Sequence, residues 1–579
     1  MSKEHRKRIR QIALINAISH AGKAQQDPVI GKILAETASL RAKVKEIIPL
    51  VAEIIEEVNK LSLEDQKKLA GDLWLKASSK GKEDKERRLP ALPNTGKYET
   101  VVTRFSPNPD APIHLGSARA IILCHEYAKM YSGKFLVRFE DTDPKLKQPK
   151  LPFYDMIEED LGWLDCKPDE YYFQSDRLPI YYAYTEKLIT QGNAYICHCR
   201  PHKFKELIVA QTACPCRNLS PKEQMRRWQK MQDGTYKERE VVVRVKTDLA
   251  HPNPAVRDWP AMRIINTQKH PHPRVGSKYR VWPLYNLACG IDDHLLGITH
   301  IIRGKEHLTN QTRQEYMYKY FGWKYPEAIH YGRMKIAGAS LSKSKIVQGM
   351  QEGIYQSWDD PRLATFAALR RRGIKPEAIR QLIIDVGPKS QDLTLSWENL
   401  YAHNRKLVEP IANRYFFIGN PLKMIVRNIP KSLSAKVALH PDHPERGFRQ
   451  FVIEPDHGVA RAWVSSKDVN NFEPGQVVRL MGAFNVKIGD IEENSVETVF
   501  HSKQLREARE LKAPLIHWIP EYMNLKCRVV LPTAHVLEGL AEDSCAELEA
   551  DTIVQFERFG FVRIDSNEKH LVTAYYCHR

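Results

Sequence analysis

Apolar residues recur at three- and four-residue spacing over the first 76 residues, which predicts helices there. IRQIALINAI and VKEIIPLVAEIIEEV carry this pattern, and LSLEDQKKL indicates a capped helix start. The charged, proline-bearing segment near residues 78–96 then predicts an exposed linker. Residues 1–95 are therefore expected to form a helical extension and its linker.

Strand and helix patterns alternate after this linker. KYETVVTRF predicts a strand, a helix is expected from about Ser117 to Tyr131, and GKFLVRFEDTDP predicts a second strand that ends on an acidic loop. This order is typical of a β-α-β unit and hence of a parallel sheet. Residues 175–282 break the rhythm, and RVWPLYNLACGIDDHLLGITHIIRG then predicts short apolar strands again. We expect an α/β sheet that is interrupted by an insertion.

The last 230 residues change from helix to strand patterns. LATFAALRRRGIKPEAIRQLIIDV predicts helices within residues 351–405. From about residue 406, short β-branched runs are separated by Pro, Gly, Asn and Asp. This pattern predicts β-barrels or β-sandwiches over residues 406–579.

Composition and charge limit the class of protein. Hydrophobic residues make up 42% and aromatic residues 9% of the 579 residues, which excludes global disorder. We find neither a run of about 18 apolar residues nor a signal sequence, so we expect a soluble, intracellular protein without a membrane partner. The net charge of +18 favours a polyanionic partner such as nucleic acid, although solubility alone is the alternative.

The segment RFSPNPDAPIHLGSAR, which begins at Arg104, joins the first strand to the helix through a proline-stiffened loop. The free N–H groups at the start of a helix favour phosphate. His114 could hydrogen-bond a phosphate oxygen, and Gly116 leaves room for a nucleotide against the backbone. The alternative is an ordinary histidine in a surface loop.

A second candidate segment, SLSKSK at residues 340–345, follows in a Gly- and Ser-rich loop. A mobile lysine flanked by hydroxyl groups suits the charge that develops on a transferring or leaving phosphate. The alternative is an exposed polar turn, because short Ser/Lys strings are common.

Four cysteines form two C-x-C pairs that are separated by 14 residues: Cys197, Cys199, Cys214 and Cys216. Four thiolates on two tight turns match a closed tetrahedral zinc site that holds a loop with little core of its own. His198 and His202 are possible substitute ligands. The alternative is a chance cluster of thiols in a reducing compartment.

Taken in this order, HLGS and SLSKS resemble the His-Ile-Gly-His and Lys-Met-Ser-Lys-Ser motifs of class I aminoacyl-tRNA synthetases. The first departs at Leu115 and Ser117, and the second has Ser-Leu in place of Lys-Met. TRFSPNPDAPIHLGSARAI, LVRFEDTDP and IDDHLLGITHIIRGKEHLTNQTRQEYMYKYFGW look like archaeal-type glutamyl-tRNA synthetases, which are related to the glutaminyl enzymes.

The resemblance implies the functional residues. His114 and Lys343 would be catalytic. ATP, bound with Mg²⁺, would contact residues of both motif segments: Asn108, His114, Gly116, Ser117, Ser342, Lys343 and Ser344. Glutamate would contact Arg104, Glu140, Tyr285, Cys289 and Arg303.

Discrimination between glutamate and glutamine must use the γ-carboxylate charge, because the two amino acids are nearly isosteric. A desolvated carboxylate requires a cation, and guanidinium offers a bidentate fit. The resemblance places Arg303 at this position, where glutaminyl enzymes have an uncharged residue, and gives Glu140 the α-ammonium. Either residue could instead be an ordinary partner in an ion pair or a turn.

Asp292, Asp293 and His294 look like a metal triad. Three adjacent residues on a strand or turn point in different directions, however, which argues against joint coordination. We expect a structural or RNA-positioning role for them.

The resemblance also implies a domain organisation and partners. A Rossmann-like catalytic domain would comprise residues 96–174 and 283–350, with an acceptor-end-binding insertion at 175–282. Residues 351–405 would contact the tRNA stem, and the β-barrels of 406–579 would bind the anticodon. The partners would be L-glutamate and tRNA(Glu), bound by a cytoplasmic monomer, and charging of tRNA(Gln) as a second tRNA is an open alternative.

Three alternatives remain open from the sequence. A glutaminyl-tRNA synthetase is the nearest, and Arg303 argues against it. A small adenylyltransferase would lack the C-terminal β region and the basic excess. A non-catalytic RNA-binding scaffold would not require intact His114, Gly116, Glu140, Arg303 and Lys343.

Overall fold

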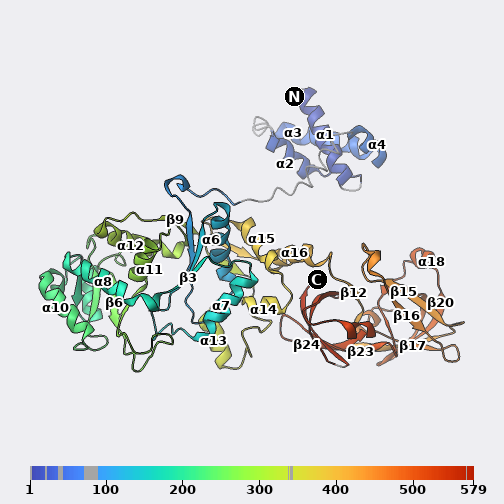
Figure 1. Ribbon diagram of the computed structural model, residues 1–579. Helices are drawn as coiled ribbons and strands as arrows, with labels where there is room; N and C mark the ends of the chain where they lie inside the picture. Colours follow the sequence, from blue (N-terminus) through green and yellow to red (C-terminus); the bar gives the residue numbers. More distant parts are fainter. Residues whose placement is uncertain are drawn as a thin grey trace. The chain divides into compact units, whose positions relative to one another are not determined.

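The computed structural model describes residues 3–19, 22–36, 44–70, 89–336, 338, 343–568 and 570–579 (Figure 1). The chain divides into two compact units, Met1–Arg88 and Leu89–Arg579, which are described separately. Within the described residues, no helix is both long and apolar enough to span a membrane.

The first unit is helical, as its apolar spacing predicts. Ile9, Ile33, Ile54 and other aliphatic side chains of its helices share one buried core. Ser62 accepts a hydrogen bond from the Asp65 N–H (3.1 Å), which confirms the capped start. Residues 71–88, which hold most of the predicted linker, lie outside the described part. The helices are α1 (Lys3–Ser19), α2 (Gln26–Glu36), α3 (Val44–Asn59) and α4 (Leu63–Ala70).

The second unit begins with the predicted β-α-β arrangement. Three parallel strands form a sheet in the order β1-β2-β3, with Arg104 opposite Leu136. Helix α6 packs its buried face, including Ile121 and Ile122, into the core beside this sheet. The elements are β1 (Val102–Phe105), α6 (Ala118–Met130), β2 (Lys134–Phe139), α7 (Leu151–Trp163) and β3 (Glu170–Phe173).

An antiparallel sheet in the order β4-β5-β6-β7 interrupts the parallel strands. Its core includes the buried Trp228, Trp259 and Trp282 and also takes in buried side chains from two later helices, at residues 287–291 and 317–318. Its elements are α8 (Leu178–Thr190), β4 (Ala194–Cys197), α9 (Pro201–Val209), α10 (Pro221–Gln232), β5 (Val242–Val245), β6 (Pro260–Ile264) and β7 (Val281–Pro283).

The parallel strands resume with β8, which lies beside β1 because the Thr299 N–H donates to the Val102 carbonyl (3.0 Å). One prediction is wrong here. The segment YNLACGIDDHL forms helix α11 rather than a strand or turn, since its small and apolar residues also fit a buried helix. The elements are α11 (Tyr285–Leu295), β8 (His300–Gly304), α12 (Leu308–Phe321), β9 (Glu327–Tyr331), β10 (Met334–Ile336) and α13 (Lys343–Gln351).

A helical segment follows and contributes one strand to the earlier region. Strand β11 pairs in parallel with β10, so Met334 lies opposite Leu393. Arg371 reaches the C-terminal region through an ion pair with Asp565 (3.0 Å). The elements are α14 (Phe366–Arg371), α15 (Pro376–Val386), β11 (Leu393–Leu395) and α16 (Trp397–Val408).

The C-terminal region contains two curled seven-stranded sheets, which confirms the strand prediction. One sheet has the order β21-β18-β19-β20-β14-β17-β22, and the other has the order β12-β25-β26-β27-β23-β24-β13. The chain thus enters the second sheet, forms the first, and then returns.

The elements of the C-terminal region follow in chain order. They are β12 (Arg414–Tyr415), β13 (Phe417–Gly419), β14 (Pro421–Arg427), β15 (Leu433–Ala438), β16 (Phe448–Ile453), β17 (Ala460–Ser465), α17 (Ser466–Val469), β18 (Val477–Leu480), β19 (Asn485–Ile491), β20 (Ser495–Ser502), α18 (Leu505–Glu510), β21 (Leu515–Ile516), β22 (Ile519–Pro520), β23 (Asn524–Val530), β24 (Val536–Glu542), β25 (Ile553–Phe556), β26 (Gly560–Glu568) and β27 (Leu571–His578).

Candidate active site

His114 lies between the end of β1 and the start of α6, and two backbone contacts hold it there. It forms an isolated antiparallel bridge with Thr365, and the Leu115 N–H donates to the Ala364 carbonyl (2.8 Å). The His114 Nδ1 accepts a hydrogen bond from the Gly116 N–H (3.0 Å). Burial lowers the pKa of His114, so the ring is neutral and carries its proton on Nε2. That N–H can donate to an anionic oxygen beside the helix start.

Asn108 lies in the loop that leads to His114. Its side-chain Oδ1 is buried and accepts no hydrogen bond within the described residues. A buried acceptor in this position can accept a hydrogen bond from an N–H or O–H group of a bound molecule. Gly116 and Ser117 follow in a short 3₁₀ turn that leads directly into α6.

Arg303, at the end of β8, is 5% exposed and is surrounded by neutral groups. It donates to the Tyr325 hydroxyl (3.0 Å) and lies 3.4 Å from the His330 Nε2 and 3.5 Å from the Gln314 Oε1. No ion pair joins it to a carboxylate in the part of the chain that the structure describes. A buried cation without an anion is costly, so this pocket favours an anionic ligand.

Two other buried arginines have carboxylate partners on α11. Arg104 donates to both oxygens of Asp293, at 3.0 and 3.2 Å, and Arg138 donates to Asp293 at 2.7 Å. Asp292 accepts from Arg177 at 2.8 Å. Burial alone would raise the pKa of Asp293, but Arg104 and Arg138 lower it to about 2. The Asp293 carboxylate is therefore ionised, and both carboxylates anchor α11 to neighbouring arginines.

The contacts of residues 292–294 fit the structural role expected for this segment. The carboxylates meet arginines, and the His294 ring stacks on Trp323 with ring centres 3.8 Å apart. These three residues form no metal-binding group in the described chain. The observed contacts are structural, and a role in positioning RNA stays a prediction.

Glu140 follows β2 and is directed toward the same pocket. Its Oε1 accepts from Arg138 (3.3 Å) and from the Cys289 thiol (2.9 Å). Burial raises the pKa of Cys289 far above its usual value, so the sulfur remains a proton donor. Tyr285 is one helical turn from Cys289, and its hydroxyl interacts electrostatically with Cys289, Glu140, Arg303 and Arg104. The structure thus brings the five residues predicted to contact glutamate together.

Two histidines beside Arg303 escaped the sequence analysis. Burial, and next the charge of Arg303, lower the pKa of both His307 and His330 to about 4. His330 lies opposite Arg303 in the parallel β8–β9 pair. Pairing of β8 with β9 would have indicated His330, but the sequence alone does not show which strand pairs with β8.

The second motif falls largely outside the described residues. Strand β10 ends at Ile336 and α13 begins at Lys343. Ser342 lies outside the described part, as do the side chains of Lys343 and Ser344. Their predicted contacts with ATP therefore remain predictions.

The four cysteines of the insertion gather in one cluster. Their sulfur atoms all lie within 4.8 Å of one another, and those of Cys197 and Cys214 are 3.9 Å apart. Four sulfurs at about 2.3 Å from a tetrahedral zinc ion would be roughly 3.8 Å apart, so the cluster fits that ion. The His198 ring packs against Tyr236 instead, with ring centres 4.8 Å apart. Neither His198 nor His202 belongs to the metal-binding group that the described residues form.

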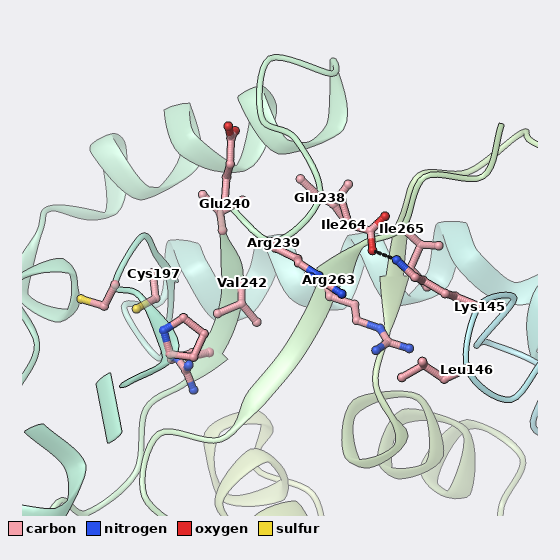
Figure 2. Close-up of a pocket in the computed structure, with 14 residues that line it drawn as sticks. Lys145, Leu146, Cys197, Glu238, Arg239, Glu240, Val242, Arg263, Ile264 and Ile265 are labelled. Atoms are coloured by element: carbon pink, nitrogen blue, oxygen red, sulfur yellow. Dashed lines mark hydrogen bonds and ion pairs between the residues drawn. The ribbon is translucent and has the colours of Figure 1, made fainter. Parts of the chain in front are cut away.

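A cavity of about 580 Å³ lies where the insertion meets the loop after β2 (Figure 2). Figure 2 shows Lys145 of that loop paired with Glu238 of the insertion. Arg263 of the insertion also pairs with Asp143 of the loop (2.7 Å). The loop that carries Glu140 is thus held by the insertion. Basic side chains line the cavity: Lys145, Arg239, Arg244 and Arg263.

Family models match three parts of the chain. Residues 100–410 match the catalytic domain of the class I tRNA synthetases (E and Q). The chain belongs to this family. Residues 412–503 and 515–565 each match an anticodon-binding domain of the same class I synthetases.

Relatives of this class I synthetase match it over its whole length. Those from Pyrococcus furiosus and Thermococcus kodakarensis are 54% and 53% identical, covering 98% and 100% of both chains in each pair. A Methanocaldococcus jannaschii relative is 45% identical over 99% of this chain and 100% of its own. Each of the three is named a glutamate–tRNA ligase.

Proposed function

We propose that this class I synthetase joins L-glutamate to the 3′ end of tRNA(Glu) at the expense of ATP. The observation that carries the substrate assignment is Arg303, a buried guanidinium whose hydrogen-bond partners among the described residues are all neutral. A γ-carboxylate supplies the missing negative charge and accepts two parallel hydrogen bonds. The full-length relatives named glutamate–tRNA ligase support the same substrate.

Glutaminyl-tRNA synthetase activity is the alternative, and the same pocket disfavours it. The neutral amide of glutamine leaves the charge of Arg303 uncompensated and presents N–H groups to a guanidinium that has no acceptor. Such a mismatch costs several kcal/mol, enough to reject glutamine without a second hydrolytic site.

The proposed reaction has two steps. The α-carboxylate of glutamate attacks the α-phosphorus of Mg-ATP, forming glutamyl-adenylate and releasing pyrophosphate. A ribose hydroxyl at the 3′ end of the tRNA then attacks the acyl carbon and displaces AMP. No covalent enzyme intermediate is required, so the protein acts by positioning the reactants and stabilising charge.

The residues divide this work between the two substrates. The neutral His114 donates from Nε2 to phosphate, beside the N–H groups at the start of α6. Lys343 meets the charge on the departing pyrophosphate. Glu140 receives the α-ammonium of glutamate. Cys289 holds one oxygen of Glu140, which leaves the other oxygen for the substrate.

Charging assays with purified tRNAs test this function. The wild-type protein should attach radiolabelled glutamate to tRNA(Glu) with release of AMP and pyrophosphate, and His114→Ala should lower the rate by ~10²-fold. Charging of glutamine in preference to glutamate would overturn the assignment.

We further propose that the cysteine cluster holds a structural zinc ion. The supporting observation is the 3.9 Å separation of Cys197 and Cys214, close to the edge of a zinc–thiolate tetrahedron. The ion would tie β4 to the 3₁₀ turn at Pro215–Asn218. Elemental analysis should find about one zinc per chain, and Cys197→Ser with Cys214→Ser should remove it. Protein purified without added metal that contains no zinc would contradict this proposal.

The remaining regions are assigned to tRNA. We place the acceptor end at residues 175–282, where the arginines of the cavity can meet phosphates, and the stem at residues 351–405. The curled sheets of residues 406–579 would bind the anticodon. Binding should weaken steeply between low and moderate salt, as counterion release requires. A salt-independent affinity would argue against several phosphate contacts.

Three finer properties complete the proposal. The enzyme works as a monomer in the cytoplasm, where tRNA is charged for translation. It also accepts tRNA(Gln), attaching glutamate to it, if the third anticodon base is not discriminated. Parallel charging of the two purified tRNAs decides that point, and light scattering decides the oligomeric state.

A further inference from the structure

Arg119 lies in the first turn of α6, five residues after His114, and is fully buried. Its guanidinium donates to three backbone carbonyls and to no carboxylate of the described residues. Nη1 donates to Gly332 (2.7 Å), Nη2 donates to Gly387 (2.7 Å) and Lys389 (2.8 Å), and Nε also donates to Gly387 (3.0 Å). The guanidinium carbon lies 4.7 Å from the ring centre of Tyr331.

The three carbonyls belong to residues that precede strands β10 and β11 in the chain. Gly332 precedes β10, whose last residue is Ile336, and the SLSKS segment follows it in the chain. Gly387 and Lys389 precede β11, which pairs with β10. The Gly332 N–H in turn donates to the Lys389 carbonyl (2.9 Å). The Arg119 side chain thus joins α6, the helix that follows the first motif, to the residues that lead into β10 and β11.

Only a guanidinium can make these contacts. Its planar fork offers five N–H donors in fixed directions, and Arg119 uses four hydrogen bonds to reach three carbonyls from three points of the backbone. A lysine ammonium could meet one or two of them. Burial of a cation with no carboxylate partner is costly, and simple core packing would be achieved more cheaply by an apolar residue.

We infer that Arg119 is a positioning residue, which fixes strands β10 and β11 relative to the His114 end of α6, at the point after which the chain continues into the SLSKS residues. This inference rests on the proposed function, because it acts through Lys343. Pyrophosphate release requires groups from both motifs to meet one triphosphate. Misplacement by about 1 Å can cost ~10²-fold in rate. Arg119 supplies the shared anchor that keeps the two motifs in register.

The test is the rate of pyrophosphate formation in a single turnover with saturating tRNA(Glu). Arg119→Lys keeps the charge but loses the fork, and should lower this rate by roughly 10- to 100-fold and raise the KM for ATP, with the KM for glutamate within about twofold. The matched control is Arg372→Lys. Arg372 is equally buried and donates to the Tyr401 hydroxyl and the Cys577 carbonyl, away from both motifs. It should lose comparable thermal stability while its pyrophosphate rate stays within about threefold.

A double-mutant cycle separates positioning from general damage. If Arg119 acts through Lys343, adding Arg119→Lys to Lys343→Ala should lower the rate no further, whereas independent effects would multiply. Multiplying effects, or a wild-type rate for Arg119→Lys, would overturn the inference. If Arg119→Lys fails to fold, Tyr331→Leu is the second variant, because it removes the ring that packs on the Arg119 guanidinium. An unchanged pyrophosphate rate in Tyr331→Leu would then overturn the inference.

The same variants also distinguish a failure of the positioning inference from a failure of the proposed function. If Lys343→Ala is impaired and Arg119→Lys is not, only the positioning inference fails. If Lys343→Ala itself keeps the wild-type rate, the role given to that lysine in the proposed function fails first, and the inference fails with it.

Discussion

Three buried arginines lie close to the predicted glutamate contacts, and they differ in their hydrogen-bond partners. Arg104 and Arg138 meet the carboxylate of Asp293 at hydrogen-bonding distance. Arg303 meets a hydroxyl, an imidazole and an amide. The first pair has its counter-charge within the protein and therefore supports the scaffold. Arg303 has no hydrogen-bonded carboxylate among the described residues, and Asp293 acts on it only at longer range, so we expect a ligand to supply its direct counter-charge.

The pKa values record the same difference. Beside Arg104 and Arg138, a buried carboxyl group has a pKa of about 2 because two cations stabilise its charge. Beside Arg303, burial and the uncompensated positive charge lower the pKa of two histidines to about 4. The second environment remains positive until an anion enters. Among the arginines beside the predicted glutamate contacts, the one without a carboxylate partner is therefore the best candidate for binding an anionic substrate.

The largest expected effect follows from replacing one arginine of each kind with leucine. Arg303→Leu should lower kcat/KM for glutamate by ~10³-fold or more, since a desolvated γ-carboxylate loses its cation. The free energy of unfolding should stay equal or rise, because an uncompensated buried charge is removed. Arg104→Leu should instead lower it, since Asp293 loses a bidentate partner.

Steady-state kinetics and denaturant unfolding of both variants measure this contrast. Arg303→Leu should also narrow the gap between glutamate and glutamine, although Arg104 retains part of the preference. A variant of Arg303 with wild-type kcat/KM for glutamate would mean that the γ-carboxylate is recognised elsewhere.

The sequence predicted the fold where local pattern and tertiary environment agree. The alternation of strand and helix around HLGS gives the parallel sheet, and the β-branched runs after residue 406 give the curled sheets. It misjudged YNLACGIDDHL, because a buried helix and a buried strand are both apolar and only packing separates them. The return of the chain between the two C-terminal sheets depends on long-range pairing, which no local pattern specifies.

Those residues of the site that belong to sequence motifs could be predicted. The five residues expected around glutamate do converge, and the four cysteines do cluster. The neutral hydrogen-bond partners of Arg303 were not predicted, since Gln314 comes from α12, Tyr325 from the loop after it and His330 from β9. Nor was the anchor at Arg119, because its partners are backbone carbonyls that have no sequence signature.

A second, smaller effect tests the scaffold side of the comparison. Asp293→Asn removes the charge that Arg104 and Arg138 share, and should cost about 3 kcal/mol of unfolding free energy at pH 7. The folded pKa of about 2 is below the unfolded value of 3.8, so this stability is present above pH 4 and is lost as pH falls toward 2. The difference from wild type should therefore shrink in acid. A gap that stays constant from pH 7 to pH 3 would contradict the ion-pair account.

The smallest effect tests the ligand side through His330. Its folded pKa of about 4 is below the unfolded value of 6.5. The unfolded chain therefore takes up the proton first, and the contribution to stability is present above pH 6.5 and is lost as pH falls through 4. Between pH 7 and pH 5, the wild type should lose about 1 kcal/mol more unfolding free energy than His330→Gln, after allowance for partial exposure.

Denaturant unfolding at the two pH values, with His457→Gln as a control that leaves Arg303 and its surroundings unchanged, measures this difference. Arg303→Leu provides the decisive comparison. Removing the guanidinium removes part of the positive potential at His330, so the pH dependence assigned to this histidine should weaken in that background. Equal slopes in the presence and absence of Arg303 would mean that burial alone lowers the pKa of His330. The pocket would then lack the strong positive potential on which its selection of an anionic substrate depends.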